Sequence, residues 1–197
     1  MRLYMVRHGE SVDDIEECYG GIADFSLTAK GRDQAREVAN QLANEGIQAI
    51  YSSPLARAHE CAQIIAEQLL SKVPLKVIKD LQERNSYGVL SGVNKQRAKE
   101  IFGHILSEIK EPPGYSREPL VGAEDFDAFV RRVERAFTTV IADAQTTNCH
   151  RIAIVTHGKF TQALFEYVLR LQGQVNLKLS AVNVIEYEPA RATLIER

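Results

Sequence analysis

Two histidines and two arginines of this sequence stand in contexts that suit phosphate chemistry. His8 lies in Arg7-His8-Gly9-Glu10-Ser11, and His157 lies in Thr156-His157-Gly158. Arg57 closes the segment Ser52-Ser53-Pro54-Leu55-Ala56-Arg57. Arginine presents a planar fork of N–H donors that binds phosphate oxygens in pairs and stays charged. A neutral imidazole can act as a nucleophile. If these side chains converge, they would bind a phosphate group and attack it.

Short apolar runs precede all three segments and are expected to be buried strands. The runs are Leu3–Val6, Ala49–Tyr51 and Ile152–Val155. In an open α/β sheet, ligands bind beyond the carboxyl ends of the parallel strands. The segments that follow the runs would therefore meet at one rim of the sheet.

Helical patterns separate the strand-like runs. Apolar residues at three-four spacing predict amphipathic helices over 35–42, 58–69, 126–141 and 160–171. Strands that alternate with helices predict a single α/β domain over residues 1–197, in three layers, with a mostly parallel central sheet flanked by helices. Weaker strands are predicted at 75–78, 184–187 and 193–195, the last two as a hairpin.

The segment 86–122 breaks this pattern. It is rich in glycine and proline and only weakly periodic, with a helical stretch predicted over 96–109. We interpret it as an excursion from the domain that could cover a pocket.

The composition indicates an ordinary globular protein. The chain has 197 residues, 45% of them hydrophobic and 25% charged, with a formal net charge of -2. This balance, without a basic patch or a glycine-rich nucleotide loop, favours neither a nucleic-acid nor a membrane partner. No leader and no run of roughly 18 apolar residues is found, so a cytoplasmic location is expected. Three scattered cysteines without CxxC spacing predict neither disulfides nor a metal site. The oligomeric state cannot be read from these features.

A lone histidine after a strand is more often structural than catalytic. Here several blocks occur together, and in this order they resemble the histidine phosphatase superfamily, in its phosphoglycerate-mutase-like branch. The blocks are Arg7–Ser11; Gly21, Asp24, Leu27-Thr28, Gly31 and Gln34-Ala35; Ser52–Ala58; Leu81-Gln82-Glu83; and Val155–Gly158. The resemblance extends over nearly the whole chain and implies a phosphoglycerate-mutase-like fold.

The resemblance also implies a role for each motif residue. His8 would be the nucleophile and form a phosphohistidine, and Glu83 would be the general acid and base. Arg7, Arg57 and His157 would stabilise the transition state, without a metal ion or another cofactor. Taken alone, Glu83 beside Arg84 would be read as half of a surface ion pair.

Substrate contacts are predicted at eight further positions: Ser11, Asp14, Gly20, Gly21, Arg84, Tyr87, Lys95 and Lys159. Asp14 stands where much of the family has an asparagine that hydrogen-bonds the phosphate. A carboxylate cannot donate such a hydrogen bond unless it is protonated. Asp14 would turn toward an arginine, be protonated with substrate bound, or belong to a different loop arrangement. The spacing from Glu83 to Tyr87 is one residue longer than in the family.

The segment Tyr87–Lys95 resembles phosphoglycerate mutases, in which a tyrosine and a lysine help to hold the substrate carboxylate. The mutases also carry a longer insert with paired arginines, which this chain lacks, and Arg131-Arg132 is interpreted as part of a solvated helix face. We therefore favour a phosphomonoesterase acting on a small phosphorylated metabolite. The alternatives are a mutase primed by 2,3-bisphosphoglycerate and a phosphate-binding module without turnover.

Lys159 stands at the start of a predicted helix, where a cation is mildly unfavourable. Two interpretations remain open. An anionic ligand could offset the unfavourable position, or the lysine extends into water.

Overall fold

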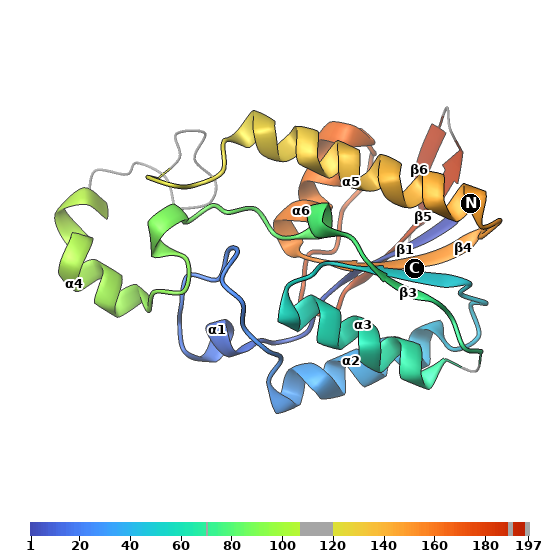
Figure 1. The fold of residues 1–197 in the computed structure, drawn as a ribbon, viewed down its shortest axis with the longest axis horizontal. Helices are drawn as coiled ribbons and strands as arrows, with labels where there is room; N and C mark the ends of the chain where they lie inside the picture. Colours follow the sequence, from blue (N-terminus) through green and yellow to red (C-terminus); the bar gives the residue numbers. More distant parts are fainter. Residues whose placement is uncertain (70, 107–119, 189–190, 196–197) are drawn as a thin grey trace.

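The computed structural model describes residues 1–69, 71–106, 120–188 and 191–195. Within these residues the centre is a six-stranded sheet in the order β3-β2-β4-β1-β5-β6 (Figure 1). The strands are β1 (Arg2–Arg7), β2 (Ala49–Ser52), β3 (Leu75–Val77), β4 (Arg151–Thr156), β5 (Val182–Glu188) and β6 (Arg191–Ile195). The strands β3, β2, β4 and β1 run parallel, and β5 and β6 are antiparallel to their neighbours. The predicted α/β fold with a mostly parallel sheet is confirmed.

Helices cover both faces of the sheet (Figure 1). The α-helices are α1 (Val12–Ile15), α2 (Ala29–Leu42), α3 (Ala56–Gln68), α4 (Lys95–Leu106), α5 (Phe126–Thr146) and α6 (Gly158–Ala163). Short 3-10 turns span Lys79–Leu81 and Gly88–Leu90, and a π-helix spans Leu164–Val168. Helices α2 and α3 lie on one face and α5 and α6 on the other, so the domain has the three predicted layers.

Each face of the sheet has its own apolar core, and β1 contributes to both. Leu3 and Met5 pack in the core below α5, whereas Tyr4 and Val6 pack in the core below α2 and α3. Successive side chains of a strand point to opposite faces, so a strand covered on both sides is apolar throughout. This explains why the strand sequence is continuously apolar rather than alternating.

Two features of its sequence explain helix α5: a capping residue at its start and an apolar stripe along one side. Asp125 precedes it, and the Asp125 carboxylate accepts a hydrogen bond from the Ala128 N–H at 2.9 Å. Such a cap satisfies one of the donors that a helix start leaves unpaired. The apolar stripe that includes Phe129, Val133 and Phe137 is buried against the sheet.

Three weaker predictions can now be compared with the structure. The strand predicted at 75–78 is present as β3 (Leu75–Val77), and the predicted hairpin is present as β5 and β6, with residues 189–190 outside the described residues. The predicted helix over 96–109 is present as α4 up to Leu106. Residues 107–119 also lie outside the described residues, so the covering role of 86–122 stays a prediction.

The predicted helix over 160–171 is not a regular α-helix. Helix α6 ends at Ala163 and continues as the π-helix, in which the Leu169 N–H donates to the Leu164 carbonyl at 2.8 Å. The three-four pattern of apolar residues does not reveal the wider turn. A π turn often marks a functional site.

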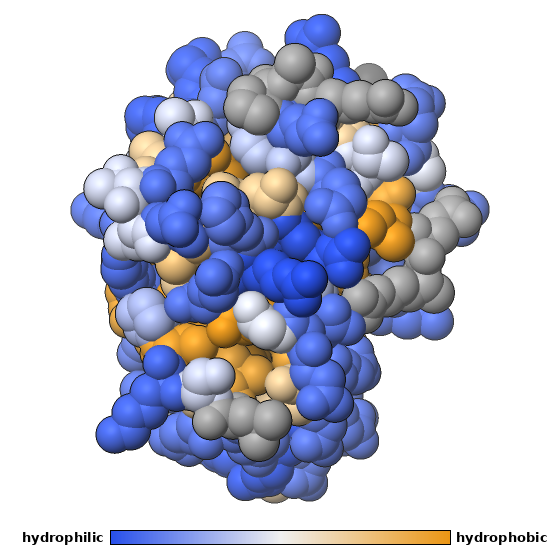
Figure 2. All heavy atoms as spheres, turned by 90° about the vertical axis from the view of Figure 1, so that its right-hand side faces the viewer, coloured by the Kyte–Doolittle hydropathy of each residue, from blue (hydrophilic) through white to orange (hydrophobic). Residues whose placement is uncertain are grey.

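Hydrophilic side chains cover most of the side of the molecule where the N-terminus lies, and apolar side chains form separate patches there (Figure 2). The carboxyl ends of the parallel strands point away from this side (Figure 1). No helix of the described residues is both long enough and apolar enough to span a lipid bilayer.

Candidate active site

The register between two neighbouring strands brings the two motif histidines together. Arg7 of β1 lies opposite Thr156 of β4 in a parallel pair, so His8 and His157 leave the sheet side by side. Their ring centroids are 5.0 Å apart with an interplanar angle of 64°. The chain positions of the histidines are 149 residues apart, and only the strand pairing makes them neighbours.

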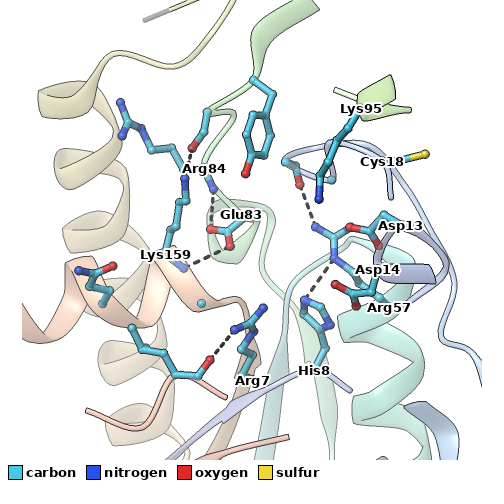
Figure 3. A pocket seen from close by; sticks show the side chains of 17 residues that line it. Arg7, His8, Asp13, Asp14, Cys18, Arg57, Glu83, Arg84, Lys95 and Lys159 are labelled. Carbon is cyan, nitrogen blue, oxygen red and sulfur yellow. Dashed lines mark hydrogen bonds between the residues drawn. The ribbon is translucent and has the colours of Figure 1, made fainter. Parts of the chain in front are cut away.

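A cavity of about 280 Å³ opens at this rim of the sheet (Figure 3). Eleven of the predicted site residues line it: Arg7, His8, Asp14, Gly20, Gly21, Arg57, Glu83, Arg84, Tyr87, Lys95 and Lys159. Its other lining residues are Asp13, Cys18, Ser86, Gly158, Gln162 and Leu177. His157 is fully buried behind this lining. Ser11 is not brought to the cavity, and its hydroxyl donates to the Asp13 carboxylate at 2.6 Å.

The hydrogen bonds of His8 specify which ring nitrogen carries the proton. Nδ1 lies 2.7 Å from the Gly9 carbonyl, which can only accept, so Nδ1 is the protonated nitrogen. The Arg57 Nε–H donates to Nε2 at 3.2 Å, which requires a lone pair on Nε2. Burial lowers the pKa of His8 well below its usual value, and the charges of Arg57 and Arg7 lower it further. His8 is therefore a neutral imidazole with its lone pair directed at Arg57.

Both arginines are held by backbone carbonyls. Arg57 donates to the Gly21 and Ala23 carbonyls, each at 2.8 Å, and Arg7 donates to the Leu177 carbonyl. Gly158 leaves room for Arg7, because a Cβ atom there would lie 3.3 Å from the guanidinium. The Arg7 Nε is buried and has no hydrogen-bond partner among the described residues. Each guanidinium is thus fixed at the cavity wall before any ligand binds.

His157 is oriented by Ser53, a residue that the sequence interpretation did not include in the site. The Ser53 hydroxyl lies 2.7 Å from His157 Nε2 and accepts a hydrogen bond from the Leu55 N–H at 3.2 Å. The Ser53 hydroxyl can donate to Nε2, and in that arrangement the His157 proton is on Nδ1. Nδ1 is buried without a partner in the described part of the chain. Burial lowers the pKa of His157 well below its usual value, with further lowering by Arg57.

Glu83 lies at the cavity edge and is bound by backbone N–H groups. Its carboxylate accepts from the N–H groups of Arg84 at 2.8 Å and of Lys159 at 3.2 Å (Figure 3), and from the N–H group of Phe160 at 3.2 Å. The last two are at the start of α6, where unpaired N–H groups favour a negative charge. Glu83 is therefore held in place by the helix, and its acid-base role remains a prediction.

Arg132 corrects a prediction from the sequence. Arg131 is exposed as expected, but Arg132 is only 6% exposed and pairs with Glu124 at 2.7 Å. The Arg132 guanidinium also donates to the carbonyls of Asp80, Gln82 and Glu83, at 2.8, 2.8 and 3.2 Å. A long helix can bury one arginine and expose the next because successive residues point about 100° apart. Arg132 holds the segment that carries Glu83.

Lys159 lies in the cavity wall and does not extend into water, so that interpretation is wrong. Its ammonium group donates to the Ser86 hydroxyl at 3.1 Å and lies 5.3 Å from the centroid of the Tyr87 ring. Burial lowers the pKa of Lys159 to about 8. A partly buried cation in a cavity wall suits an anionic ligand, and this binding role remains a prediction.

Asp14 forms no ion pair with an arginine among the described residues, although burial lowers the pKa of the nearby Arg57 and the negative charge of Asp14 acts to raise it. The Asp14 carboxylate accepts a hydrogen bond from the Ser11 N–H at 2.9 Å. It caps the short helix α1, which favours the interpretation that this loop is arranged differently. Protonation of Asp14 with substrate bound stays a prediction. Gly21, at φ +54°, offers its carbonyl to Arg57, and donation by the N–H groups of Gly20 and Gly21 also stays a prediction.

Positive side chains outnumber negative ones around the cavity. Five lining residues are cationic, namely Arg7, Arg57, Arg84, Lys95 and Lys159, and three are acidic, namely Asp13, Asp14 and Glu83. Such an excess attracts an anionic ligand. Among the described residues, no group of three or more His, Cys, Asp or Glu side chains is arranged to hold a metal ion.

A family model described as the histidine phosphatase superfamily (branch 1) matches residues 3–196. This chain belongs to the histidine phosphatase superfamily. The resemblance inferred from the motifs is thereby confirmed. The superfamily contains phosphatases and mutases, and similarity to the family does not distinguish between them.

The individual relatives of this chain likewise include both mutases and phosphatases. A 2,3-bisphosphoglycerate-dependent phosphoglycerate mutase of Bartonella bacilliformis is 40% identical over 173 residues, which cover 82% of this chain and 78% of that protein. A second such mutase, of Latilactobacillus sakei, is 42% identical over 105 residues, but these cover 51% of this chain and only 44% of that protein. The structure of the α-ribazole phosphatase from Shigella flexneri has a TM-score of 0.82 at 24% identity, covering 99% of this chain and 95% of that chain. At that identity the structural match shows the fold alone.

Proposed function

We propose that this histidine phosphatase hydrolyses phosphate monoesters of small metabolites through a phosphohistidine on His8. The observation that carries the proposal is the pair of hydrogen bonds on the His8 ring. Gly9 holds the proton on Nδ1, and Arg57 marks Nε2 as the nitrogen with the lone pair. A nucleophile must be unprotonated to attack, and this arrangement supplies it at neutral pH.

The proposed reaction has two steps. In the first, the Nε2 lone pair forms a bond to phosphorus while the ester P–O bond breaks, and Glu83 gives a proton to the leaving alkoxide. In the second, water attacks the phosphohistidine and gives a proton to Glu83. The P–N bond then breaks, which releases inorganic phosphate and restores His8. No oxidant, reductant or metal ion is needed to balance either step.

The fixed donors around His8 support this mechanism. Phosphoryl transfer spreads negative charge over the equatorial oxygens of the transferring group. The Nε of Arg7 and Nδ1 of His157 are buried polar atoms without partners in the described structure, and a phosphate oxygen bound beside them would supply a partner for each. Donors that are already oriented stabilise the transition state without reorganising during the reaction.

Mutase activity is the alternative, and the identity to the Bartonella bacilliformis mutase favours it. We favour hydrolysis because the chain lacks the longer insert of the mutases, so water should reach the phosphohistidine more readily. The two activities differ in product. With 3-phosphoglycerate, hydrolysis releases inorganic phosphate, whereas a mutase forms 2-phosphoglycerate and depends on priming by 2,3-bisphosphoglycerate.

Detection of the phosphohistidine tests the proposal. Brief exposure to a ³²P-labelled phosphate ester, followed by denaturation, should leave an acid-labile label on the wild-type protein and none on His8→Ala. A His150→Ala variant is the control, because His150 is exposed and bonds to Asn148 outside the cavity. A folded wild-type protein that binds phosphate and acquires no label would show instead a phosphate-binding module without turnover.

A further inference from the structure

A second, smaller hollow of about 90 Å³ adjoins the cavity that contains His8. Three residues, Arg84, Lys159 and Gln162, line both. The hollow also has an aromatic wall made by Phe126 and Phe129 of α5 and by Tyr167 of the π-helix. We call this second space the ring hollow. Its volume is well below the roughly 300 to 1,000 Å³ of a complete ligand site, so it suits one part of a ligand.

Two aromatic side chains of the ring hollow pack edge to face. The Phe126 and Tyr167 centroids are 5.1 Å apart at an interplanar angle of 80°, and Tyr167 is 44% exposed. The Arg84 guanidinium carbon lies 5.3 Å from the Phe126 centroid and 5.8 Å from that of Phe129. The Arg84 guanidinium, only 4% exposed, already stacks on the two phenylalanine rings and holds them in place, and a planar aromatic group can meet aromatic edges at such distances. The exposed ring area of Tyr167 would be buried by that group.

Helix α6 connects the ring hollow to the chemistry proposed above. Glu83, the proposed acid, is bound by the N–H groups of Lys159 and Phe160 in the first turn of α6. The following turns, through Gln162 to Tyr167, form one side of the ring hollow. The leaving oxygen must lie beside Glu83 to receive its proton, so the group attached to that oxygen can continue along α6. The close-up view places Lys159 and Arg84 next to Glu83, on the side away from His8 (Figure 3).

We propose that the ring hollow is a leaving-group subsite that selects phosphate esters whose alcohol carries a flat aromatic ring. This inference rests on the proposed function for the direction of the substrate. The phosphate would lie between Arg7, Arg57 and His8, and the ring would lie against Phe126 and Tyr167. The π-helix is part of this subsite because Tyr167 belongs to it.

Phosphonates test the subsite without requiring turnover. The probes are phosphonates joined to a phenyl ring through one to four methylene groups, each compared with the alkyl phosphonate of the same chain length. Isothermal titration calorimetry of the full chain measures each Kd. At one chain length the phenyl compound should bind about tenfold more tightly than its alkyl partner, a typical gain for a buried aromatic contact.

Substitutions at Phe126 and Tyr167 test whether the preference for phenyl over alkyl phosphonates comes from the ring hollow. Phe126→Ala and Tyr167→Ala should each reduce the phenyl preference to less than about threefold and leave alkyl phosphonate binding within about twofold of wild type. Tyr187→Ala is the matched control, because Tyr187 forms a similar edge contact with Phe137, 5.2 Å between centroids, and bonds to Met1 on the side where β1 begins. The control should keep the full preference.

Two results would overturn the subsite. The first is a wild-type protein without a phenyl preference at any chain length, which includes the case in which no phosphonate binds. The second is a phenyl preference that survives in both Phe126→Ala and Tyr167→Ala. These results are independent of the proposed function. Phosphohistidine formed from ethyl phosphate tests the reaction alone, and a phenyl preference without any phosphohistidine would support the subsite while rejecting the reaction.

Discussion

The two histidines at the centre of the site are oriented by hydrogen bonds to residues outside the reacting pair. Gly9 accepts from His8, and Ser53 binds His157. Burial lowers the pKa of both rings, and Arg57 lowers them further, so both are neutral at pH 7. The tautomer of a neutral imidazole depends on which partner its second nitrogen meets. The reactivity of this site therefore depends on residues that touch no substrate.

Ser53→Ala should lower kcat about tenfold. Loss of the hydroxyl leaves His157 Nε2 buried without a partner, which costs roughly 1 to 3 kcal/mol and frees the ring to change tautomer. Steady-state kinetics with p-nitrophenyl phosphate measures the effect. Ser52→Ala is the matched control, since Ser52 is equally buried but bonds to His59 at 3.0 Å. Equal losses in the two variants would show a general packing defect instead.

The charge of Lys159 should make substrate binding depend on pH. Its pKa of about 8 means that the ammonium is charged at pH 7 and mostly neutral at pH 9. Over this range KM for 3-phosphoglycerate should rise about three- to tenfold more than KM for p-nitrophenyl phosphate, because only the former has a second anionic group. Lys159→Met should show the high KM for 3-phosphoglycerate at both pH values. Equal changes for both substrates would contradict a role for Lys159 in binding that group.

At the scale of elements, two helices from distant parts of the chain hold the segment that carries Glu83. Helix α6 donates backbone N–H groups to the Glu83 carboxylate, and α5 supplies Arg132, which binds three carbonyls of the segment. The contacts from α6 are to the Glu83 carboxylate itself, whereas those from Arg132 to this segment are to backbone carbonyls only. They determine where the carboxylate points, and small displacements of a catalytic group can reduce a rate strongly.

Arg132→Lys should lower kcat/KM for ethyl phosphate about tenfold and for p-nitrophenyl phosphate less than about threefold. Lysine keeps the charge but cannot reproduce the planar fork, so Glu83 loses its alignment. Nitrophenolate leaves readily without a proton, so the hydrolysis rate of p-nitrophenyl phosphate should depend little on the position of the acid. The neighbouring Arg131→Lys, on the exposed side of α5, should leave both values unchanged. Parallel losses with both esters would indicate that Arg132 only stabilises the fold.

At the scale of the whole molecule, burial of two neutral histidines couples stability to pH. The unfolded chain binds protons at the usual histidine pKa of about 6.5, whereas the folded pKa of each ring is well below it. Well above pH 6.5 the two histidine rings are unprotonated in both the folded and the unfolded state, so their titration does not change the free energy of unfolding. As pH falls below 6.5, the unfolded state gains protons that the folded state does not bind, so stability falls.

The free energy of unfolding should therefore drop by about 2 kcal/mol between pH 6.5 and 5.5, with about half from each histidine. Urea denaturation at pH 7.5, 6.5 and 5.5 measures this change. His8→Asn should remove about half of the dependence, and His150→Asn, which replaces an exposed histidine, should remove none. Stability that stays constant over this range would show that the two rings are not held neutral.

Much of this protein follows from local patterns in its sequence. Continuous apolar runs and three-four spacing determine the strands and helices, because burial on one or both faces imposes those periods. The rule that ligands bind at carboxyl ends of parallel strands then brings Arg7, His8, Arg57 and His157 to one rim. Only the resemblance to the family indicates that Glu83 is the general acid and base, because an isolated glutamate has no local sequence signal that separates it from a surface residue.

Only the tertiary structure decided features that depend on contacts between distant segments. Arg132 looks like any helical arginine until the Asp80–Glu83 segment packs against α5 and buries it. The partner of Asp14 and the orientation of His157 depend on which donors surround them, and the sequence period does not carry that information. The ring hollow likewise exists because α5 and the π-helix meet beside Arg84. Local sequence patterns are thus sufficient for the fold class and for the residues proposed to react, whereas the packing of helices against the sheet sets the orientation of those residues and the neighbours that support them.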